Sequence, residues 1–170
     1  MTDPRRKLPL TAERLRELLD YNPEIGIFTW KKKNRKRDVG DIAGSRAGED
    51  YYQISIDYGT YRRGRLAWFY VYGEWPPIEI DHINGIRDDD RIANLRLSSA
   101  MENKWNQGKH RNNTSGYKGV IFDPRMGMWR AQIRFNRKRY YLGWFDSPEK
   151  AYAAYCEAAI RLHGEFARFA

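Results

Sequence analysis

The residues best suited to do chemistry are a carboxylate and an imidazole that stand side by side, followed by two asparagines. Asp81 and His82 are adjacent, and Asn94 and Asn103 follow within the next small supersecondary unit. Divalent metal ions such as Mg²⁺ prefer oxygen ligands, and a hydrolytic water needs a base close to the metal. The spacing therefore indicates a metal-dependent hydrolytic site. The alternative at this level is that His82 is only a structural group in a strand.

The geometry of a β-strand limits how the two neighbours can cooperate. Adjacent strand residues point to opposite faces, so Asp81 and His82 need not touch the same ion. The pattern allows Asp81 to bind the metal while His82 acts on a water molecule beside it, because an imidazole titrates near neutral pH.

The elements that must position these residues can be inferred from the surrounding pattern. Residues 79–83 and 94–97 predict two strands joined by a long turn. The pattern from Ser99 to Glu102 is that of a capping box, which opens a helix that ends near Gly108. The predicted order is therefore strand, long turn, strand and helix.

The preceding residues predict further elements of both kinds, so the fold class is α+β. They are a helix over 12–20, strands over 25–30, 51–56 and 61–65, and an apolar helix over 66–72. We expect a first domain over residues 1–108, a polar linker over 109–116 and a second domain over 117–170.

Positive charge is unevenly distributed along the 170 residues, which carry a formal net charge of +9. Residues 109–170 hold 12 Lys and Arg against 5 Asp and Glu, whereas the remainder holds 19 against 17. The C-terminal third is therefore the stronger candidate for a polyanion-binding surface, with a solubilising surface as the alternative. The densest run, over residues 31–37, predicts a loop that contacts phosphate, or else a solvated turn. Its basic residues are Lys31, Lys32, Lys33, Arg35, Lys36 and Arg37.

Several classes of protein are disfavoured by composition. The single cysteine, Cys156, excludes an intrachain disulfide and fits a reducing compartment. No apolar run approaches the length of a membrane span, and the N-terminus lacks the apolar region of a signal peptide. We therefore expect a soluble, cytoplasmic protein.

The C-terminal residues predict a separate unit of three strands and one helix. The strands cover 117–122, 129–135 and 139–145, and Ser147-Pro148 begins the helix. Alternation predicts two faces of the sheet. Trp129, Ala131, Ile133, Tyr140, Leu142 and Trp144 would face the helix, and Arg130, Gln132, Arg134, Arg139 and Tyr141 would face outward, where they could contact DNA. His163, at the end of the helix, is expected to be a surface group.

The first unit resembles the HNH endonuclease motif of phage and intron-encoded homing nucleases. The resemblance covers roughly residues 11–108 and is carried by Asp81-His82-Ile83-Asn84-Gly85, Asn94-Leu95-Arg96 and Glu102-Asn103. It implies a ββα-metal fold in which His82 is the general base and Asp81 and Asn103 ligate one Mg²⁺ or Mn²⁺. It also implies that Asn94 braces the long turn and that the products carry a 5′-phosphate and a 3′-hydroxyl.

Two positions depart from the pattern of that family. Its members often carry a His where this chain has Gly64, and an Asn where it has Asp90. If the missing His assists the site, the enzyme would be slow or inactive. The residues from Asp88 to Asp90 are interpreted as a solvated turn, with a second metal site as the alternative.

The second unit resembles the APETALA/ethylene-response-factor DNA-binding domain of plants over residues 114–169. The likeness is carried by Tyr117-Lys118-Gly119-Val120, Trp129 to Arg134, Tyr141 to Phe145 and Ala151 to Tyr155. It implies a three-stranded antiparallel sheet that enters the major groove, and it adds Lys118 to the expected DNA contacts. Ile121 and Asp123 stand where plant domains carry arginines, so we expect a different target sequence.

These observations predict a metal-dependent DNA endonuclease whose partner is double-stranded DNA, with no obligate protein partner. The first alternative is a catalytically impaired, sequence-specific DNA-binding regulator, for which Gly64 is the main support. The second is an RNA-binding protein, supported by charge and aromatic content alone. Target sequence, nicking against double-strand cleavage, the preferred ion and oligomeric state stay open.

Overall fold

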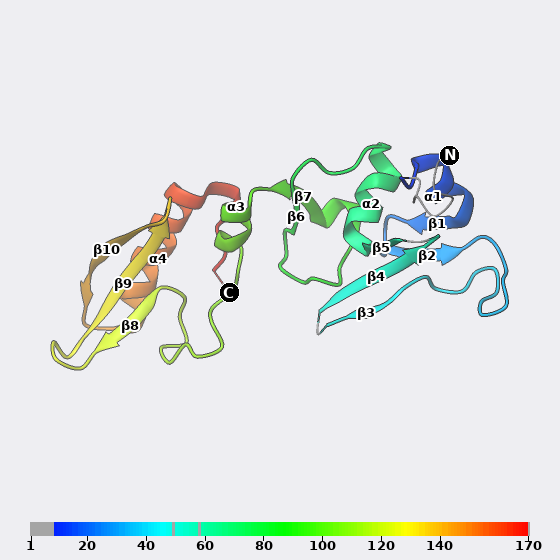
Figure 1. Ribbon diagram of the computed structural model, residues 1–170. Coiled ribbons are helices and arrows are strands. Elements are labelled where there is room, and N and C mark those ends of the chain that lie inside the picture. The colour runs from blue at the N-terminus through cyan, green and yellow to red at the C-terminus, as the bar shows by residue number, and fades with distance from the viewer. Residues whose placement is uncertain (1–8, 49, 58, 170) are drawn as a thin grey trace, which may run out of the picture. The chain divides into compact units, whose positions relative to one another are not determined.

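The computed structural model describes residues 9–48, 50–57 and 59–169 (Figure 1). The chain divides into two compact units, one ending at Leu97 and one beginning at Ser98. Antiparallel sheets are accompanied by helices, which agrees with the predicted α+β class. None of the helices in the described part of the chain is long and apolar enough to cross a membrane.

The first unit is built around a core to which most of its elements contribute. Its elements up to Tyr72 are α1 (Ala12–Leu18), β1 (Leu19–Asn22), β2 (Ile27–Trp30), β3 (Ser45–Ala47), β4 (Tyr51–Ile56), β5 (Gly59–Arg62) and α2 (Arg63–Tyr72). Leu15, Phe28, Ile54 and Leu66 are completely buried and come from four different elements. The burial of these apolar side chains is the main source of the stability of this unit.

Helix α2 begins earlier than the apolar pattern alone predicts. It starts at Arg63, so the predicted strand over 61–65 is shortened to β5 and the helix takes its last three residues. The reason is packing: Arg63 and Gly64 are buried together with Leu66 and Ala67, so the helical period extends back to a charged residue. Gly73, in the left-handed region, ends the helix.

A two-stranded sheet follows, with a long connection between its strands. The strands are β6 (Glu79–His82) and β7 (Leu95–Ser98), and the connection ends in the short 3-10 helix η1 (Ile92–Asn94). Helix α3 (Ala100–Trp105) begins at Ser99, whose hydroxyl accepts from the backbone of Glu102 while the Glu102 side chain accepts from the backbone of Ser99. This is the capping box predicted from the sequence.

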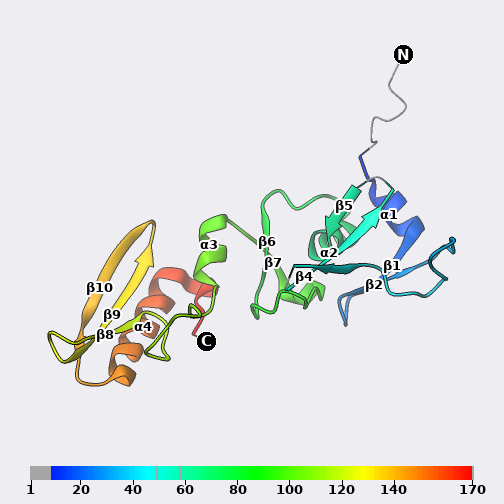
Figure 2. The same cartoon turned by 60° about the horizontal axis from the view of Figure 1, so that its bottom comes forward.

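The second unit is a three-stranded sheet covered on one face by a helix (Figure 2). The strands are β8 (Val120–Asp123), β9 (Met128–Phe135) and β10 (Lys138–Phe145), followed by α4 (Pro148–His163) and η2 (Gly164–Phe166). Val120, Ala131, Ile133, Ala151 and Tyr155 fill the space between sheet and helix. Gly119 permits the close approach, because a Cβ there would lie 2.2 Å from the Tyr155 ring.

The predicted alternation on β10 fails at its end because of a β-bulge. The register between β9 and β10 shifts between Tyr141 and Gly143, so that Trp144 pairs with Arg130 and Phe145 with Trp129. Directly paired residues share a face, so Trp144 points outward with Arg130, and Phe145 takes its place in the core. The expectation that Trp144 packs against the helix was therefore wrong.

The expectation that His163 is a surface group was also wrong. His163 is 6% exposed, its ring stacks on Trp105 of α3 at 4.7 Å, and its Nε2 donates to the backbone carbonyl of Arg134. Burial lowers the pKa of His163 below its usual value. Helix α3 therefore packs with the second unit, although the sequence motif that contains it begins in the first.

Candidate functional site

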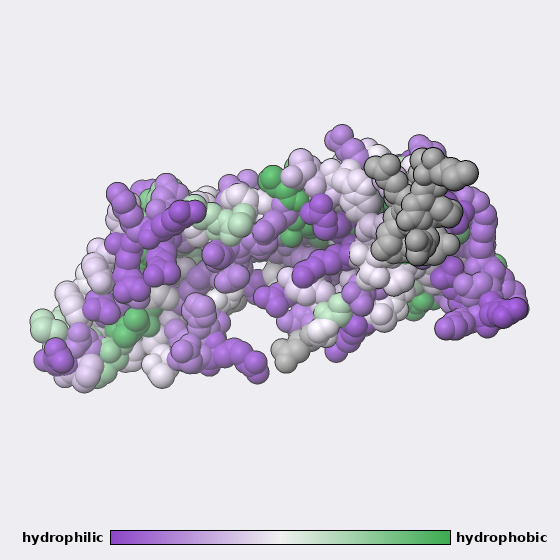
Figure 3. Space-filling view, viewed as in Figure 1, coloured by the Kyte–Doolittle hydropathy of each residue, from purple (hydrophilic) through white to green (hydrophobic). Residues whose placement is uncertain are grey.

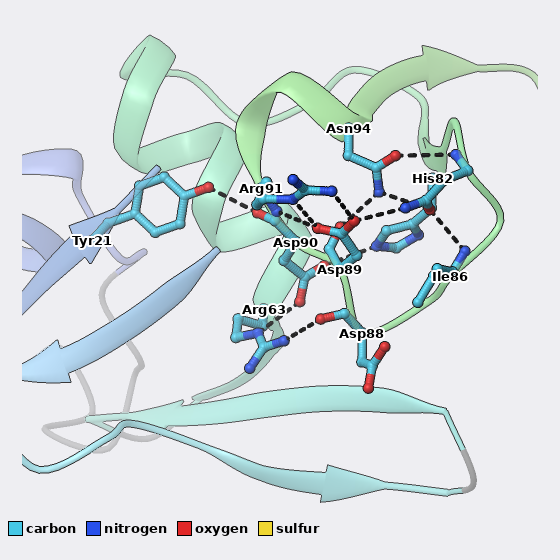
Figure 4. A network of polar contacts seen from close by, with 10 residues as sticks. Tyr21, Arg63, His82, Ile86, Asp88, Asp89, Asp90, Arg91 and Asn94 are labelled. Atoms are coloured by element: carbon cyan, nitrogen blue, oxygen red, sulfur yellow. Dashed lines mark hydrogen bonds and ion pairs between the residues drawn. The ribbon is translucent and has the colours of Figure 1, made fainter. Parts of the chain in front are cut away.

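The centre of the candidate site is a hydrogen bond between two buried side chains of the first unit (Figure 4). His82, the last residue of β6, lies with its Nε2 2.8 Å from Oδ1 of Asp90. His82 is 8% exposed and Asp90 only 2%. A buried carboxylate requires partners for its oxygens, so the surroundings of Asp90 decide whether this contact is sustained.

Asp90 and the nearby Asp88 are held by three hydrogen bonds from other parts of the first unit. Nε of Arg63 donates to Oδ2 of Asp90 at 2.7 Å, and this ion pair is almost completely buried. A second nitrogen of Arg63 donates to the backbone carbonyl of Asp88, and the hydroxyl of Tyr21 donates to the backbone carbonyl of Asp90. Figure 4 shows these contacts converging on one side of the connection between β6 and β7.

Gly64 makes room for this arrangement. A Cβ at position 64 would lie 2.6 Å from Oδ1 of Asp90 and 3.7 Å from Nε2 of His82. The two positions at which the sequence departs from the pattern of the HNH family, Gly64 and Asp90, therefore lie next to each other and close to His82.

The rest of the long connection is braced by Asn94 and Asp89. The Asn94 side chain accepts from the backbone of Asn84 and donates to the Asn84 side chain and to the carbonyl of Asp89, at 2.8–3.0 Å. The Asp89 carboxylate accepts from Arg91 and Asn84, and the hydrogen bond from Arg91 is the largest cause that lowers the pKa of Asp89 to about 2. Polar side chains therefore hold a connection that has little regular structure.

The residues expected to bind a metal ion offer oxygen donors. Asp81 is buried, and Nε and one terminal nitrogen of Arg96 donate to its Oδ2 at 2.9 and 2.8 Å. Asn103 lies on α3, which packs with the second unit. Carboxylate and amide oxygens suit Mg²⁺ or Mn²⁺, so the chemistry of the donors fits such an ion. Within the described ranges, no group of three or more His, Cys, Asp or Glu residues is arranged to hold a metal.

Cationic and aromatic side chains lie beside His82, and the sequence pattern did not single them out. The rings of Tyr51 and His82 are 6.4 Å apart. The guanidinium groups of Arg62 and Arg87 lie over the Tyr51 ring, at 4.2 and 5.3 Å from its centre. The aromatic residues at the start of the strand over 51–56, together with the arginine pair at 62 and 63, are the signal that could have indicated part of this cluster.

The basic run over residues 31–37 forms a turn in which part of the charge is paired. Lys32 pairs with Glu17, and Lys33 with Asp38 at 2.5 Å. The hydrogen bonds from Lys32 and then Arg14 hold the pKa of Glu17 at about 2. The guanidinium of Arg37 lies over the Trp30 ring, and Lys31 donates to the carbonyl of Arg16. Carboxylates of the chain itself therefore neutralise part of the positive charge of this run.

The outward face of the second unit consists of three cross-strand pairs on β9 and β10. The pairs are Arg134 with Arg139, Gln132 with Tyr141, and Arg130 with Trp144. Tyr141 is 63% exposed and Trp144 40%, and the guanidinium of Arg130 lies within 5.5 Å of the centre of each ring. In Figure 3, hydrophilic residues cover much of the visible surface around this sheet.

Lys118, also expected to contact DNA, has a different environment. Its ammonium group donates to the backbone carbonyls of Trp105, Gln107 and Arg168. Burial lowers the pKa of Lys118 to about 8, and the nearby charge of Arg168 acts in the same direction. The three donors of this lysine thus connect α3 to the C-terminal end of the second unit.

Comparison with known families matches each half of the chain separately. A family model described as HNH endonuclease matches residues 61–104, and one described as AP2 domain matches residues 115–165. Protein 3.8 of Escherichia phage T7 is 35% identical over 113 residues, which are 66% of this chain and 93% of that protein.

Two plant proteins are similar to the second half only. APETALA2-like protein 2 of Oryza sativa subsp. japonica is 43% identical, and AP2-like ethylene-responsive transcription factor TOE2 of Arabidopsis thaliana 41% identical, each over 54 residues. These residues are 32% of this chain but only 12% and 11% of the plant proteins. No solved structure matches the chain.

Proposed function

Since the chain belongs to the family of Protein 3.8 of Escherichia phage T7 and contains an HNH endonuclease domain and an AP2 domain, we propose that it is a metal-dependent DNA endonuclease. The observation that supports this most directly is the buried contact of His82 with Asp90. His82 directly follows Asp81, whose carboxylate is the proposed metal ligand. Burying a histidine between charged groups costs free energy, and such an arrangement is typical of functional sites.

In this proposal His82 removes a proton from the water that attacks the phosphodiester. Asp81 and Asn103 hold a divalent ion, Mg²⁺ or Mn²⁺, through their oxygen atoms. When bound, the ion supplies stabilisation of the negative charge on the phosphate and on the leaving oxygen. Asn94 keeps the connection after His82 in place through its hydrogen bonds to Asn84 and Asp89. The products carry a 5′-phosphate and a 3′-hydroxyl.

The AP2 domain supports binding to duplex DNA. Arg130, Gln132, Arg134, Arg139 and Tyr141 share the outward face of the sheet, and Trp144 joins them there. Arginine and glutamine side chains can donate to base edges and phosphates. The rings of Tyr141 and Trp144 lie near the Arg130 guanidinium and limit its orientation. The basic run over residues 31–37 is a second proposed phosphate contact, chiefly through its exposed lysines.

The test is cleavage of supercoiled plasmid by the full chain, with Mg²⁺, with Mn²⁺ and with chelator. We expect metal-dependent relaxation or linearisation by the wild type, and a loss of roughly 10²–10⁴ in rate for His82→Ala, the range by which a general base contributes. Arg161→Ala, on the exposed side of α4, is the control for purification and DNA handling. End-labelling of the products tests for the 5′-phosphate.

Two results would contradict the proposal. Cleavage by His82→Ala at the wild-type rate would remove His82 from the reaction. Tight binding to duplex DNA without cleavage under any ion would favour a DNA-binding regulator instead, and the AP2 domain would then carry the function.

A further inference from the structure

We propose that Asp90 is a positioning residue of this site, which sets the tautomer of His82 so that Nδ1 receives the proton from the attacking water. This inference rests on the proposed endonuclease function. It follows from the identity of the donors and acceptors around one carboxylate, each of which is placed by the structure.

The assignment of the tautomer follows from what Asp90 can accept. Arg63 remains charged at any physiological pH and donates from Nε to Oδ2, so the partner of this buried ion pair is an ionised carboxylate. An ionised carboxylate has no proton to donate. In the 2.8 Å contact between Oδ1 and Nε2, the proton therefore belongs to His82 Nε2. In the neutral imidazole this leaves the lone pair on Nδ1.

The proton balance of the step is then complete. A proton passes from the attacking water to Nδ1 as the water oxygen bonds to phosphorus, and the bond from phosphorus to the 3′ oxygen breaks. The leaving oxygen takes a proton from solvent. The imidazolium that forms carries protons on both nitrogens, and the Asp90 carboxylate stabilises it through the hydrogen bond from Nε2.

The contacts of Asp90 leave its carboxylate little freedom to adopt another orientation. Both of its oxygens are engaged, by Arg63 and by His82, and its backbone carbonyl accepts from Tyr21. The absence of a side chain at Gly64 is required, because a Cβ would lie 2.6 Å from Oδ1. The contact between His82 and Asp90 is thus maintained from α2 and β1 as well as from the connection itself.

Asp90→Asn tests the inference with almost no change in shape. It places the residue that is common in the family beside Gly64 instead of beside the His that is common there, so His82 gains no replacement partner from position 64. Arg63 can only donate, so the amide oxygen of the new side chain must face Arg63 and its NH₂ group must face His82. Nε2 would then have to accept, and the proton would move to Nδ1, where it blocks removal of a proton from water. We expect kcat to fall by roughly 10²–10⁴, as when a triad carboxylate is replaced by its amide, with KM changed by less than about threefold.

The control is Asp88→Asn, the same chemical change at an exposed side chain two residues away. Asp88 contacts Arg63 through its backbone carbonyl, which the substitution leaves intact. We expect this variant to cleave at the wild-type rate. An Asp90→Asn enzyme that cleaves as fast as Asp88→Asn would overturn the inference.

A second measurement is independent of cleavage. In the metal-free, ¹⁵N-labelled full chain, the nitrogen shifts of the His82 ring report which nitrogen carries the proton. We expect Nε2–H in the wild type and Nδ1–H in Asp90→Asn. The same tautomer in both would overturn the role of Asp90 even if activity fell. Absence of cleavage by the wild type under any ion would instead contradict the proposed function and leave the tautomer result standing. If Asp90→Asn does not fold, Gly64→Ala is measured in its place, with loss of the Nε2–H signal as the expected result.

Discussion

The two units use polar side chains in opposite ways. In the first, Arg63, Asp90 and His82 are withdrawn from solvent and held by one another. In the second, arginines and aromatic rings of β9 and β10 stand on an outward face, positioned by the register of the strands. In the first unit, hydrogen bonds fix the His82 ring and the Asp90 carboxylate. In the second, a row of side chains is presented to solvent along one face of the sheet.

The difference follows from what each proposed task requires. A general base must be positioned to within a fraction of an ångström. Burying charged groups costs free energy of folding, but it fixes the position of the base and so favours the reaction. A surface that meets DNA must exchange water and counterions for phosphates and base edges, so its side chains remain hydrated until they bind. Substitutions should therefore change different quantities in the two units.

The largest effect on stability is expected when the buried ion pair is broken. Arg63→Met leaves the Asp90 carboxylate buried without its cation, which should cost about 3–5 kcal/mol of unfolding free energy. Arg87→Met is the matched control, because the ion pair of Arg87 with Asp50 is exposed and should be worth less than about 1 kcal/mol. Urea denaturation, with hydrogen exchange followed over residues 63–94, measures both. Equal losses in the two variants would mean that the buried network does not stabilise the first unit.

A smaller effect, on binding alone, is expected on the outward face of β9. Arg130→Ala should weaken binding to duplex DNA by about 1–3 kcal/mol and leave stability nearly unchanged. Arg161→Ala removes the same charge from the exposed side of α4 and should change affinity much less. Fluorescence anisotropy over a salt series separates the two. If both variants lose affinity alike, net charge and not the outward face governs binding.

A pH-dependent effect is expected at His163, the one buried histidine of the second unit among the residues described. Burial lowers its pKa below the unfolded value of 6.5, so the unfolded chain takes up the proton first as the pH falls. The stability contribution is therefore present above about pH 6.5 and is lost as the pH falls below it. His163→Phe should abolish this dependence in thermal unfolding, whereas His110→Phe, at an exposed position, should retain it. A wild-type profile that stays flat below pH 6.5 would contradict the assignment.

The smallest effect is expected in the basic run. The pair of Lys33 and Asp38 is 73% and 67% exposed, so Lys33→Met should change unfolding free energy by less than about 1 kcal/mol. If this run contacts phosphate, the slope of log affinity against log salt should fall by about 1. An unchanged slope would assign the run to the solvated surface.

The sequence predicted the periodic features better than the interruptions. Period-two alternation placed Ala131 and Ile133 in the core and left Arg134 exposed, because β9 is regular. The same rule failed at Trp144, because a bulge between Tyr141 and Gly143 reverses which residues of β10 face the helix after that point. A strict alternation of residues cannot predict where such a bulge occurs. The sequence did offer one signal, because a glycine inside a strand often marks a bulge. That glycine is Gly143, and its φ is positive in the structure.

The contact between His82 and Asp90 could not be predicted from the periodicity of the sequence. Asp90 was interpreted as part of a solvated turn, since three consecutive aspartates usually lie in water. Its burial depends on Arg63, Gly64 and Tyr21, which are far from it in sequence. His163 was misjudged for a similar reason, because Trp105, on which its ring stacks, lies on α3. The contact of Lys118 with the carbonyl of Trp105 was likewise not visible in the sequence.

The packing of α3 has a practical consequence for dividing this protein. The HNH match ends at residue 104, yet Trp105 stacks on His163 and Phe135, and Lys118 donates to the carbonyls of Trp105 and Gln107. A fragment that starts at residue 109, at the polar stretch that looks like a natural cutting point, would expose His163 and leave Lys118 short of acceptors. A fragment that starts at Ser98 would keep the capped helix with the sheet that supports it.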